Sequence, residues 1–218
     1  MTVYAIIDTE TTGLDPVIKA VEVAWIVIDE DTNVLDEQVH RVNPYRPISE
    51  GARAIHGISN EDVALCPTIE SVVGLLPQPF VAIGHIVDFD LRVLGPYIEF
   101  TGKVCTCALS RKWLKNTTNH KLATLQKELK LSEQLSHSAL GDCRTALEVL
   151  RIVIKLSGRK LPQLVELESV PKMLQCMPFG MHKGKPFTNV PRPYREWLLK
   201  QTDLPKDLRY TLEKLSIL

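Results

Sequence analysis

The strongest constraint on the fold is the stretch Val3–Leu14, in which an apolar run ends in two acids separated by one residue. The β-branched and aromatic residues before the acids are typical of a buried strand. Side chains alternate between the two faces of a strand, so Asp8 and Glu10 point the same way, about 6.5 Å apart. Two carboxylates directed together from a core strand are costly to keep charged unless a cation lies between them.

This stretch leaves two interpretations open. Either the two acids bind a divalent cation, or they end a strand and simply face solvent. Carboxylate oxygens are hard ligands, so Mg²⁺ or Mn²⁺ would suit the first interpretation. The rest of the chain has to decide between them.

Length and composition set the class of protein. The 218 residues allow one domain of ordinary size and a small additional module. A hydrophobic content of 44% with 24% charged residues is typical of a soluble globular protein. The five cysteines are odd in number and contain no CxxC pair, which argues against a disulfide framework or a zinc site. We expect reduced thiols in a cytoplasmic protein, with no signal peptide and no membrane span.

Charge is unevenly distributed although the formal net charge is zero. Residues 1–102 contain 16 acidic and 5 basic residues, whereas residues 103–130 contain 7 basic residues and 1 acidic residue. Residues 172–218 contain 9 basic and 4 acidic residues. An acidic half beside two basic tracts fits a metal site in a protein that also holds a polyanion, although solvated helix faces give some asymmetry too.

Strand-like and helix-like patterns alternate along the chain, which predicts an α/β layer architecture. After the first strand, the expected strands cover residues 20–28, 34–42, 80–84 and 103–106. The expected helices cover residues 52–56, 68–76 and 89–100, two stretches within 107–131, and residues 139–155. The pattern breaks near Gly158, which predicts a domain of residues 1–157, a linker over 158–172 and a module of residues 173–218.

A second acidic pair, Asp88 and Asp90, lies between the apolar strand over 80–84 and the helix expected after it. An acid at a helix N-terminus is favourable for the helix dipole, so capping by Asp88 explains one of the two acids without any chemistry. Asp90 would then lie in the first turn of the helix and be available for another role.

A third acid, Asp142, lies beside the apolar stripe of the helix expected over 139–155, an awkward place for an unpaired carboxylate. His137 precedes it by five residues and is therefore expected on the loop before the helix, from which its ring can reach the same site. A lone histidine in such a place is more often an ordinary surface residue. Gly141 leaves space beside the acid, consistent with close packing or substrate approach.

In sequence order, these residues resemble the histidine-bearing branch of the DEDD exonuclease superfamily, which has the DnaQ-like fold. The first motif matches over residues 8–13, the second from His85 to Asp90, and the third from His137 to Asp142. The segments Val21–Ala24 and Ile55–Ile58 also resemble features of the family. Each motif is weak alone, but three in order, over about residues 1–156, are a specific signal.

The resemblance implies a ribonuclease H-like mixed sheet flanked by helices and a Mg²⁺-dependent 3′→5′ exonuclease. Asp8, Glu10, Asp90 and Asp142 would bind two Mg²⁺ ions, which Mn²⁺ could replace, and His137 would act as the general base. The terminal nucleotide would be held by Thr11, Thr12, Gly13, Leu14 and Phe89. One departure is Ile86, since many relatives have Asn there, and it puts the local hydrogen bonding near the substrate in doubt.

The leading expectation for the substrate is the 3′ end of DNA, in repair or proofreading, with release of nucleoside monophosphates. The first alternative is trimming of RNA on the same fold, because the fold and metals do not select the sugar. A second alternative is a non-catalytic nucleic-acid-binding or replisome adaptor protein, which would require a degraded site. The sequence leaves the oligomeric state open, a homodimer included.

The tail over residues 177–186 resembles the C-terminal module of bacterial exodeoxyribonuclease X-like proteins. Those proteins commonly carry a basic residue where this chain has Met181, which is a second departure. His182, Lys183 and Lys185 would supply cationic donors for a nucleic-acid grip. Two aromatic residues of the module, Tyr194 and Trp197, either stack with bases or belong to its small core. The candidate core residues are Phe179, Phe187, Val190, Tyr194, Trp197, Leu198, Leu208, Leu212 and Leu215.

Overall fold

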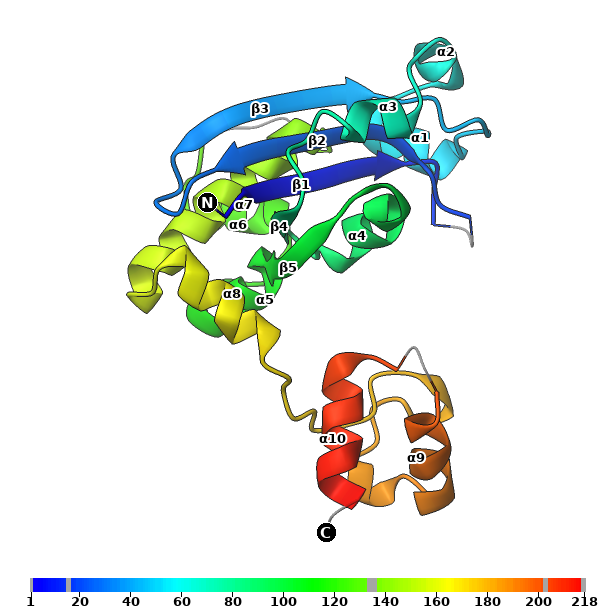
Figure 1. Ribbon diagram of the computed structural model, residues 1–218, viewed down its shortest axis with the longest axis vertical. Helices are drawn as coiled ribbons and strands as arrows, with labels where there is room; N and C mark the ends of the chain where they lie inside the picture. The colour runs from blue at the N-terminus through cyan, green and yellow to red at the C-terminus, as the bar shows by residue number, and fades with distance from the viewer. Residues whose placement is uncertain (1, 15–16, 133–136, 202–203, 217–218) are drawn as a thin grey trace. The chain divides into compact units, whose positions relative to one another are not determined.

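The computed structural model describes residues 2–14, 17–132, 137–201 and 204–216. The chain divides into two compact units, Met1–Glu168 and Ser169–Leu218. Figure 1 shows a sheet flanked by helices in the first unit and a small helical second unit. Among the described helices, none is long and apolar enough to cross a membrane.

The first unit is built on a sheet of five strands. These are β1 (Tyr4–Thr11), β2 (Ala20–Ile28), β3 (Val34–Arg41), β4 (Phe80–Gly84) and β5 (Phe100–Cys105). The helices are α1 (Glu50–His56), α2 (Asn60–Val63), α3 (Ile69–Val73), α4 (Asp88–Leu94), the short 3-10 helix η1 (Gly95–Tyr97), α5 (Thr106–Trp113), α6 (Leu122–Glu128), α7 (Ala139–Ser157) and α8 (Leu161–Ser169).

The strand order is β3-β2-β1-β4-β5, with β1 in the centre. The first three strands form the expected antiparallel meander, and β4 and β5 are added parallel to β1. Parallel strands need a crossover, and the helices between β3 and β5 provide it. The predicted α/β class with a mixed sheet flanked by helices is confirmed.

The two faces of the sheet have separate apolar cores. Tyr4 and Ile6 of β1 face α7, and that core also receives side chains from α5 and α8. Ala5 and Ile7 point to the other face, which α3 and α4 cover. Since side chains alternate along a strand, Asp8 and Glu10 continue the face that packs against α7.

Several element boundaries differ from those expected. The helix expected over 89–100 ends at Leu94 and is followed by η1, which contains Pro96, and β5 begins at Phe100 rather than Lys103. The helix α2 was not expected. A capping box between Ser59 and Asp62 forms its start, which shows how a helix of one turn is stabilised by polar groups rather than by periodicity.

The linker expected over 158–172 is largely helical instead. Helix α8 occupies Leu161–Ser169, and its residues Leu161 and Leu164 are fully buried in the core beside α7. Gly158 ends α7 in the left-handed conformation, and Pro162 lies in the first turn of α8, where a missing N–H is tolerated. The two helix breakers therefore mark a tight turn between helices and not a linker.

The second unit has its own small core. It contains the 3-10 helices η2 (Gly180–His182) and η3 (Phe187–Asn189) and the helices α9 (Arg192–Leu199) and α10 (Lys206–Ser216). The buried apolar residues are Met177, Phe187, Val190, Leu198, Leu208 and Leu212. Of the expected core residues, Phe179 and Trp197 are exposed, so the apolar pattern of this tail overestimated its core.

Candidate active site

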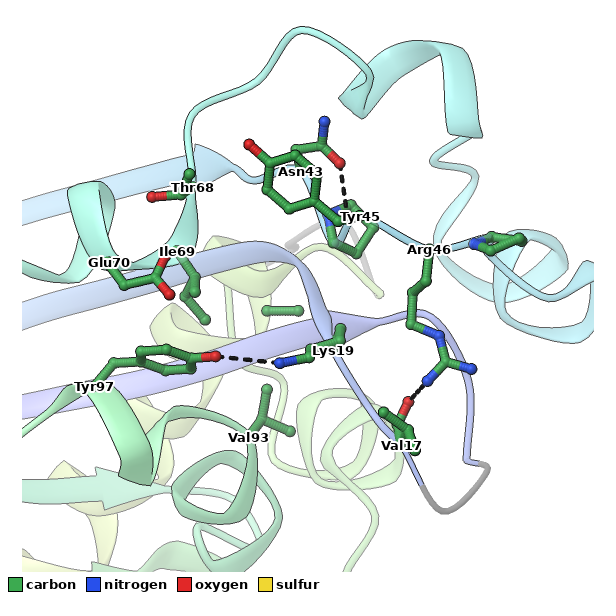
Figure 2. Close-up of a pocket in the computed structure, with 13 residues that line it drawn as sticks. Val17, Lys19, Asn43, Tyr45, Arg46, Thr68, Ile69, Glu70, Val93 and Tyr97 are labelled. Carbon is green, nitrogen blue, oxygen red and sulfur yellow. Dashed lines mark hydrogen bonds between the residues drawn. The ribbon is translucent and has the colours of Figure 1, made fainter.

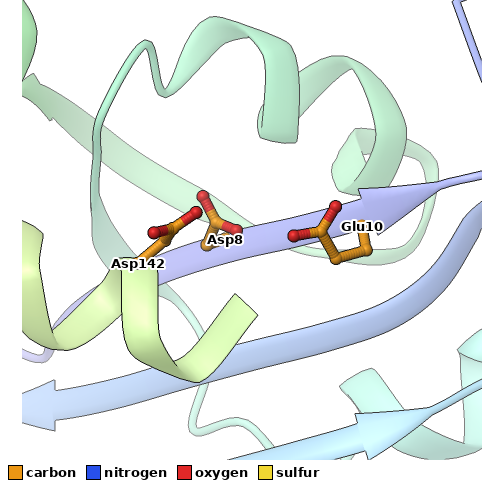
Figure 3. Close-up of side chains that lie close together, drawn as sticks. All are labelled: Asp8, Glu10 and Asp142. Carbon is orange, nitrogen blue, oxygen red and sulfur yellow. The ribbon is translucent and has the colours of Figure 1, made fainter. Parts of the chain in front are cut away.

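The carboxylates of Asp8, Glu10 and Asp142 converge at the end of β1. One oxygen of each lies within 4.8 Å of the others, and Figure 3 shows Asp142 on α7 facing the two acids of the strand. Among the described residues, this is the only group of at least three acidic, histidine or cysteine side chains with such spacing. The convergence arises because α7 packs directly on β1 and β2 and carries Asp142 in its first turn.

Asp90, on α4, is not one of these three but lies near them, because it is bonded to β1 and its charge acts on Asp8. It is only 3% exposed, and its carboxylate accepts a hydrogen bond from Thr9 Oγ1 at 2.8 Å. Among the neighbouring charges, that of Asp90 raises the pKa of Asp8 most. Asp88, by contrast, has a side chain that is 71% exposed and forms an ion pair with Lys103.

The expected capping role of Asp88 is wrong. Helix α4 begins at Asp88 itself, and the preceding residue, Val87, makes no side-chain capping hydrogen bond. Asp88 therefore lies inside the first turn and points to solvent, whereas Asp90 is directed into the protein. The helix geometry separates the two acids because residues two apart lie on different faces of a helix.

The four carboxylates have raised pKa values because they are desolvated and close together. Burial raises the pKa of Asp8 well above its ordinary value, and the charges of Asp90, Asp142, Glu10 and Glu22 add to it. Burial also raises the pKa of Glu10 to about 7. For Asp90, burial raises the pKa to about 7, although the hydrogen bond from Thr9 opposes it. Like charges this close cannot all ionise without a compensating cation.

The residues present fit a divalent metal site. Every donor is a carboxylate, the hard oxygen ligand that Mg²⁺ and Mn²⁺ prefer. The raised pKa values come first from burial and then from neighbouring negative charge, and a bound cation would offset both. A bound metal would therefore explain why a core strand ends in buried acids.

His137 lies on the loop before α7, as expected. It has a positive φ of 62° and an exposed side chain. Burial raises the pKa of Asp142 to about 6, and the nearby His137 lowers it. Histidine is among the few residues other than glycine that adopt this backbone conformation with some frequency.

His85, in the second motif, follows β4 directly, and its ring contacts the start of α5. It is not part of the acidic cluster. Its Nε2 donates to the carbonyl of His120 at 2.7 Å, and its Nδ1 lies 2.9 Å from Thr106 Oγ1. Desolvation by burial lowers the pKa of His85, which favours the neutral ring. The next residue, Ile86, has a positive φ of 71° and is 56% exposed. Asn would tolerate this left-handed backbone better than the β-branched isoleucine does.

A pocket of about 380 Å³ lies beside Glu10. Three residues expected to bind substrate contribute to it, namely Thr11, Gly13 and the 84% exposed Leu14. Two others do not line it: Thr12 is buried, with its N–H donating to the carbonyl of Lys19 at 2.9 Å, and Phe89 lies under the guanidinium of Arg92.

The opposite wall of this pocket was not part of the expected site. It is formed by Ser49, Gly51, Ala52, Ile55 and His56. His56 Nε2 lies 3.1 Å from the carbonyl of Thr11, so α1 and the end of β1 are joined directly. The family resemblance marks Ile55–Ile58 without giving it a role, and this contact supplies one.

A larger hollow of about 770 Å³ is lined by residues that include Val17, Lys19, residues 43–47 and Tyr97. Figure 2 shows Lys19 reaching Tyr97 across it, with an Nζ to hydroxyl distance of 3.2 Å, and Arg46 donating to the carbonyl of Val17. Its lining contains a single acid, Glu70, and none of the four carboxylates described above. It is therefore separate from the candidate metal site.

The expected grip residues of the second unit differ in their surroundings. Lys183 and Lys185 are exposed, whereas His182 is partly buried with its ring centroid 4.8 Å from that of Tyr194. The turn that presents the two lysines is closed by the N–H of Gly184, which donates to the carbonyl of Met177 at 2.8 Å. Trp197 is 52% exposed and lies beside Tyr194, at 5.6 Å between ring centroids.

Comparison with known proteins identifies relatives over the whole chain. Residues 5–150 match the family model described as Exonuclease (RNase T). The chain is 33% identical over 218 aligned residues to Exodeoxyribonuclease 10 of Escherichia coli K12, covering 95% of this chain and 96% of that protein. It is 29% identical to the PolC-type DNA polymerase III of Thermotoga petrophila, covering 77% of this chain and 13% of that protein.

Solved structures agree with these matches. Exonuclease X in complex with 5′ overhanging duplex DNA has a TM-score of 0.64 at 30% identity, and the match covers 76% of this chain and 99% of that chain. Escherichia coli exonuclease I in complex with a dT13 oligonucleotide has a TM-score of 0.64 at 15% identity, covering 81% of this chain and 47% of that chain. The second likeness concerns the fold alone.

Proposed function

This chain belongs to the exonuclease family and is a nuclease, and from that premise we propose that it is a Mg²⁺-dependent 3′→5′ exonuclease acting on DNA. It would remove nucleoside monophosphates from 3′ ends, in repair or proofreading. The observation that carries the proposal is the convergence of Asp8, Glu10 and Asp142, with Asp90 hydrogen-bonded to the same strand. DNA is favoured because a 33% identical relative is named an exodeoxyribonuclease and a solved relative contains duplex DNA.

The four carboxylates would hold the metal, which when bound activates water and stabilises the leaving 3′ oxygen. His137 in its neutral form would accept the proton from the attacking water; its exposed side chain on the loop before α7 and its effect on the pKa of Asp142 support this role. Water adds to phosphorus, the bond from phosphorus to the 3′ oxygen breaks, and that oxygen takes up a proton. The products are a nucleoside 5′-monophosphate and a strand shortened by one nucleotide.

The pocket beside Glu10 would hold the terminal nucleotide. Its volume of about 380 Å³ is in the range of small-molecule sites, and it opens directly beside the acid cluster. Gly13 has a φ of 144°, and a Cβ there would lie 2.9 Å from Ser49 Oγ, so the loop can approach α1 only with glycine. Leu14 and Ile55, both exposed in this pocket, would supply apolar contacts to the nucleotide.

The second unit would act as an additional nucleic-acid grip. Exposed Lys183 and Lys185 offer charge to phosphates, and the open face of Trp197 offers stacking to a base. His182 would contribute less directly, because its ring packs on Tyr194. The catalytic unit, Met1–Glu168, would then be assisted by the unit Ser169–Leu218.

The decisive experiment is a digestion time course with Mg²⁺ on matched DNA and RNA oligomers labelled at the 5′ end. We expect a ladder that shortens from the 3′ end, faster on DNA, and no ladder with Asp8→Ala. A ladder on RNA alone would assign the enzyme to RNA trimming. Binding without any ladder would contradict the catalytic proposal.

A further inference from the structure

Glu22 lies on β2, directly opposite Glu10 in the strand register, and is not among the proposed metal ligands. Its side chain is only 12% exposed. One carboxylate oxygen, Oε1, accepts a hydrogen bond from the backbone N–H of Ala139 at 3.1 Å. The other, Oε2, lies 3.8 Å from Nε of Arg41. These partners satisfy both oxygens of a carboxylate that is largely removed from water.

Ala139 is the first residue of α7. Its N–H has no acceptor within the helix, because the first backbone N–H groups of any α-helix lack one. The N-cap residue Ser138 satisfies a different N–H, that of Gly141, at 3.2 Å. Glu22 therefore completes the cap of α7 from a strand 117 residues away in sequence, and its negative charge suits a helix N-terminus.

The position of this cap matters because the groups proposed for catalysis flank it. His137 precedes Ala139 by two residues, and Asp142 follows it within the same first turn. Only the N-cap residue Ser138 separates His137 from the first turn of α7, and His137 lowers the pKa of Asp142, so the loop end and the helix start form one continuous unit of the chain. A contact that fixes Ala139 to the sheet also fixes that unit relative to Asp8 and Glu10.

We propose that Glu22 is a positioning residue for the reaction: its hydrogen bond to Ala139 holds the start of α7, and with it His137, in register with β1. The inference rests on the proposed role of His137 as general base. In this role Glu22 acts as the hydrogen-bond acceptor for the N–H of Ala139, and the effect of its negative charge on the metal site is the smaller contribution. Geometry errors of about 1 Å around a reacting group reduce rates by up to about a hundredfold.

The test compares three variants by kcat in Mg²⁺ and by oligonucleotide affinity in Ca²⁺. Glu22→Ala should reduce kcat about tenfold and leave the affinity unchanged, because the substrate pocket lies elsewhere. Glu22→Gln should stay within about threefold of wild type, because an amide oxygen can still accept the N–H of Ala139. The matched control is Glu37→Ala, which removes a pairing of β3 with Arg144 of α7 that does not involve the helix start. It should leave kcat unchanged.

Two further measurements distinguish positioning from a general loss of structure. Amide hydrogen exchange at Ala139 should accelerate in Glu22→Ala and not in Glu37→Ala. In a His137→Ala background, Glu22→Ala should lower the residual kcat by a smaller factor than in the wild-type background, because only Asp142 is left for it to position. A Gln variant as poor as the Ala variant would show that the charge acts on the metals and would overturn the inference. An equal loss in both backgrounds would overturn it as well.

The failure of the underlying function would look different. A His137→Ala variant with wild-type kcat would refute the general-base role and this inference together, whatever Glu22 does. An inactive His137→Ala variant with a fully active Glu22→Ala variant would refute only the positioning role. Melting curves of each variant with EDTA confirm that the comparison is made between folded proteins.

Discussion

The two units of this protein carry charge in opposite ways. In the first unit, negative charge is concentrated at the buried end of a core strand, where burial raises the pKa of every member of the cluster. In the second unit, Lys183 and Lys185 project into solvent from a glycine turn. The first arrangement destabilises the fold unless a cation binds, and the second does not affect the core. The buried acids need a compensating cation, whereas the exposed lysines remain solvated and are free to meet a polyanion.

The largest effect should come from removing one buried charge. Asp8→Asn is expected to lower kcat by about a thousandfold or more, since it removes a metal ligand at the centre of the cluster, while the melting temperature in EDTA rises by several degrees. Digestion assays and calorimetry measure both. A variant that is inactive and also less stable would show that the acids support the fold, and the contrast between the two units would fail.

Without bound metal, the first unit should lose stability as the pH rises from about 4 to 7. Glu10 and Asp90 have pKa values of about 7 in the folded protein, above their ordinary values, so the folded state binds more protons than the unfolded state between about pH 4 and 7. Stability without metal should therefore fall as pH rises through that range. We expect the melting temperature in EDTA to be about 5 °C higher at pH 5 than at pH 8, and Mg²⁺ to restore it at pH 8.

That experiment has an internal control. At pH 5 the carboxylates are largely protonated, so Mg²⁺ should change the melting temperature little there. An increase of equal size at both pH values would indicate binding elsewhere on the surface. Activity should follow the same pattern, with the Mg²⁺ concentration needed for half-maximal rate rising below about pH 7.

The exposed charges of the second unit should affect binding and not chemistry. Lys183→Ala combined with Lys185→Ala is expected to weaken single-stranded DNA binding several-fold and to lower the salt slope of log K by about 0.7 for each phosphate that is no longer neutralised. Lys214→Ala is the matched control, because Lys214 is an exposed lysine of α10 that lies over Tyr210. An equal loss of DNA affinity in Lys214→Ala would show that Lys183 and Lys185 contribute only general positive charge and form no specific binding site. The rate on a trinucleotide should not change.

The smallest expected effect concerns backbone strain at the edge of the site. Ile86 adopts a left-handed conformation that disfavours a β-branched residue. Ile86→Asn should raise the free energy of unfolding by about 1 kcal/mol, because Asn tolerates this conformation. Urea unfolding of the variant, with Ile55→Asn as a control at another exposed isoleucine, measures the gain. A loss of stability would mean that Ile86 makes apolar contacts worth more than the strain.

The sequence determined most of the site because its signals are local. Strand alternation placed Asp8 and Glu10 on one face, and helical periodicity placed Asp142 beside the stripe that packs on that face. The order of the three motifs then indicated the family, and the comparisons confirmed it. The roles of the individual site residues and the boundaries of the two domains remain predictions.

Tertiary structure alone decided which polar groups meet. The burial of Asp90 and the exposure of Asp88 depended on which side of a short helix packs inward. The part proposed for Glu22 depended on where α7 begins relative to β2. The sequence pattern did not predict helix α8, which is stabilised by the burial of Leu161 and Leu164 in the core beside α7. Periodicity specifies the direction of a side chain from its own backbone, but burial and hydrogen-bond partners depend on segments distant in the sequence, as the bond between Glu22 and Ala139 across 117 positions shows.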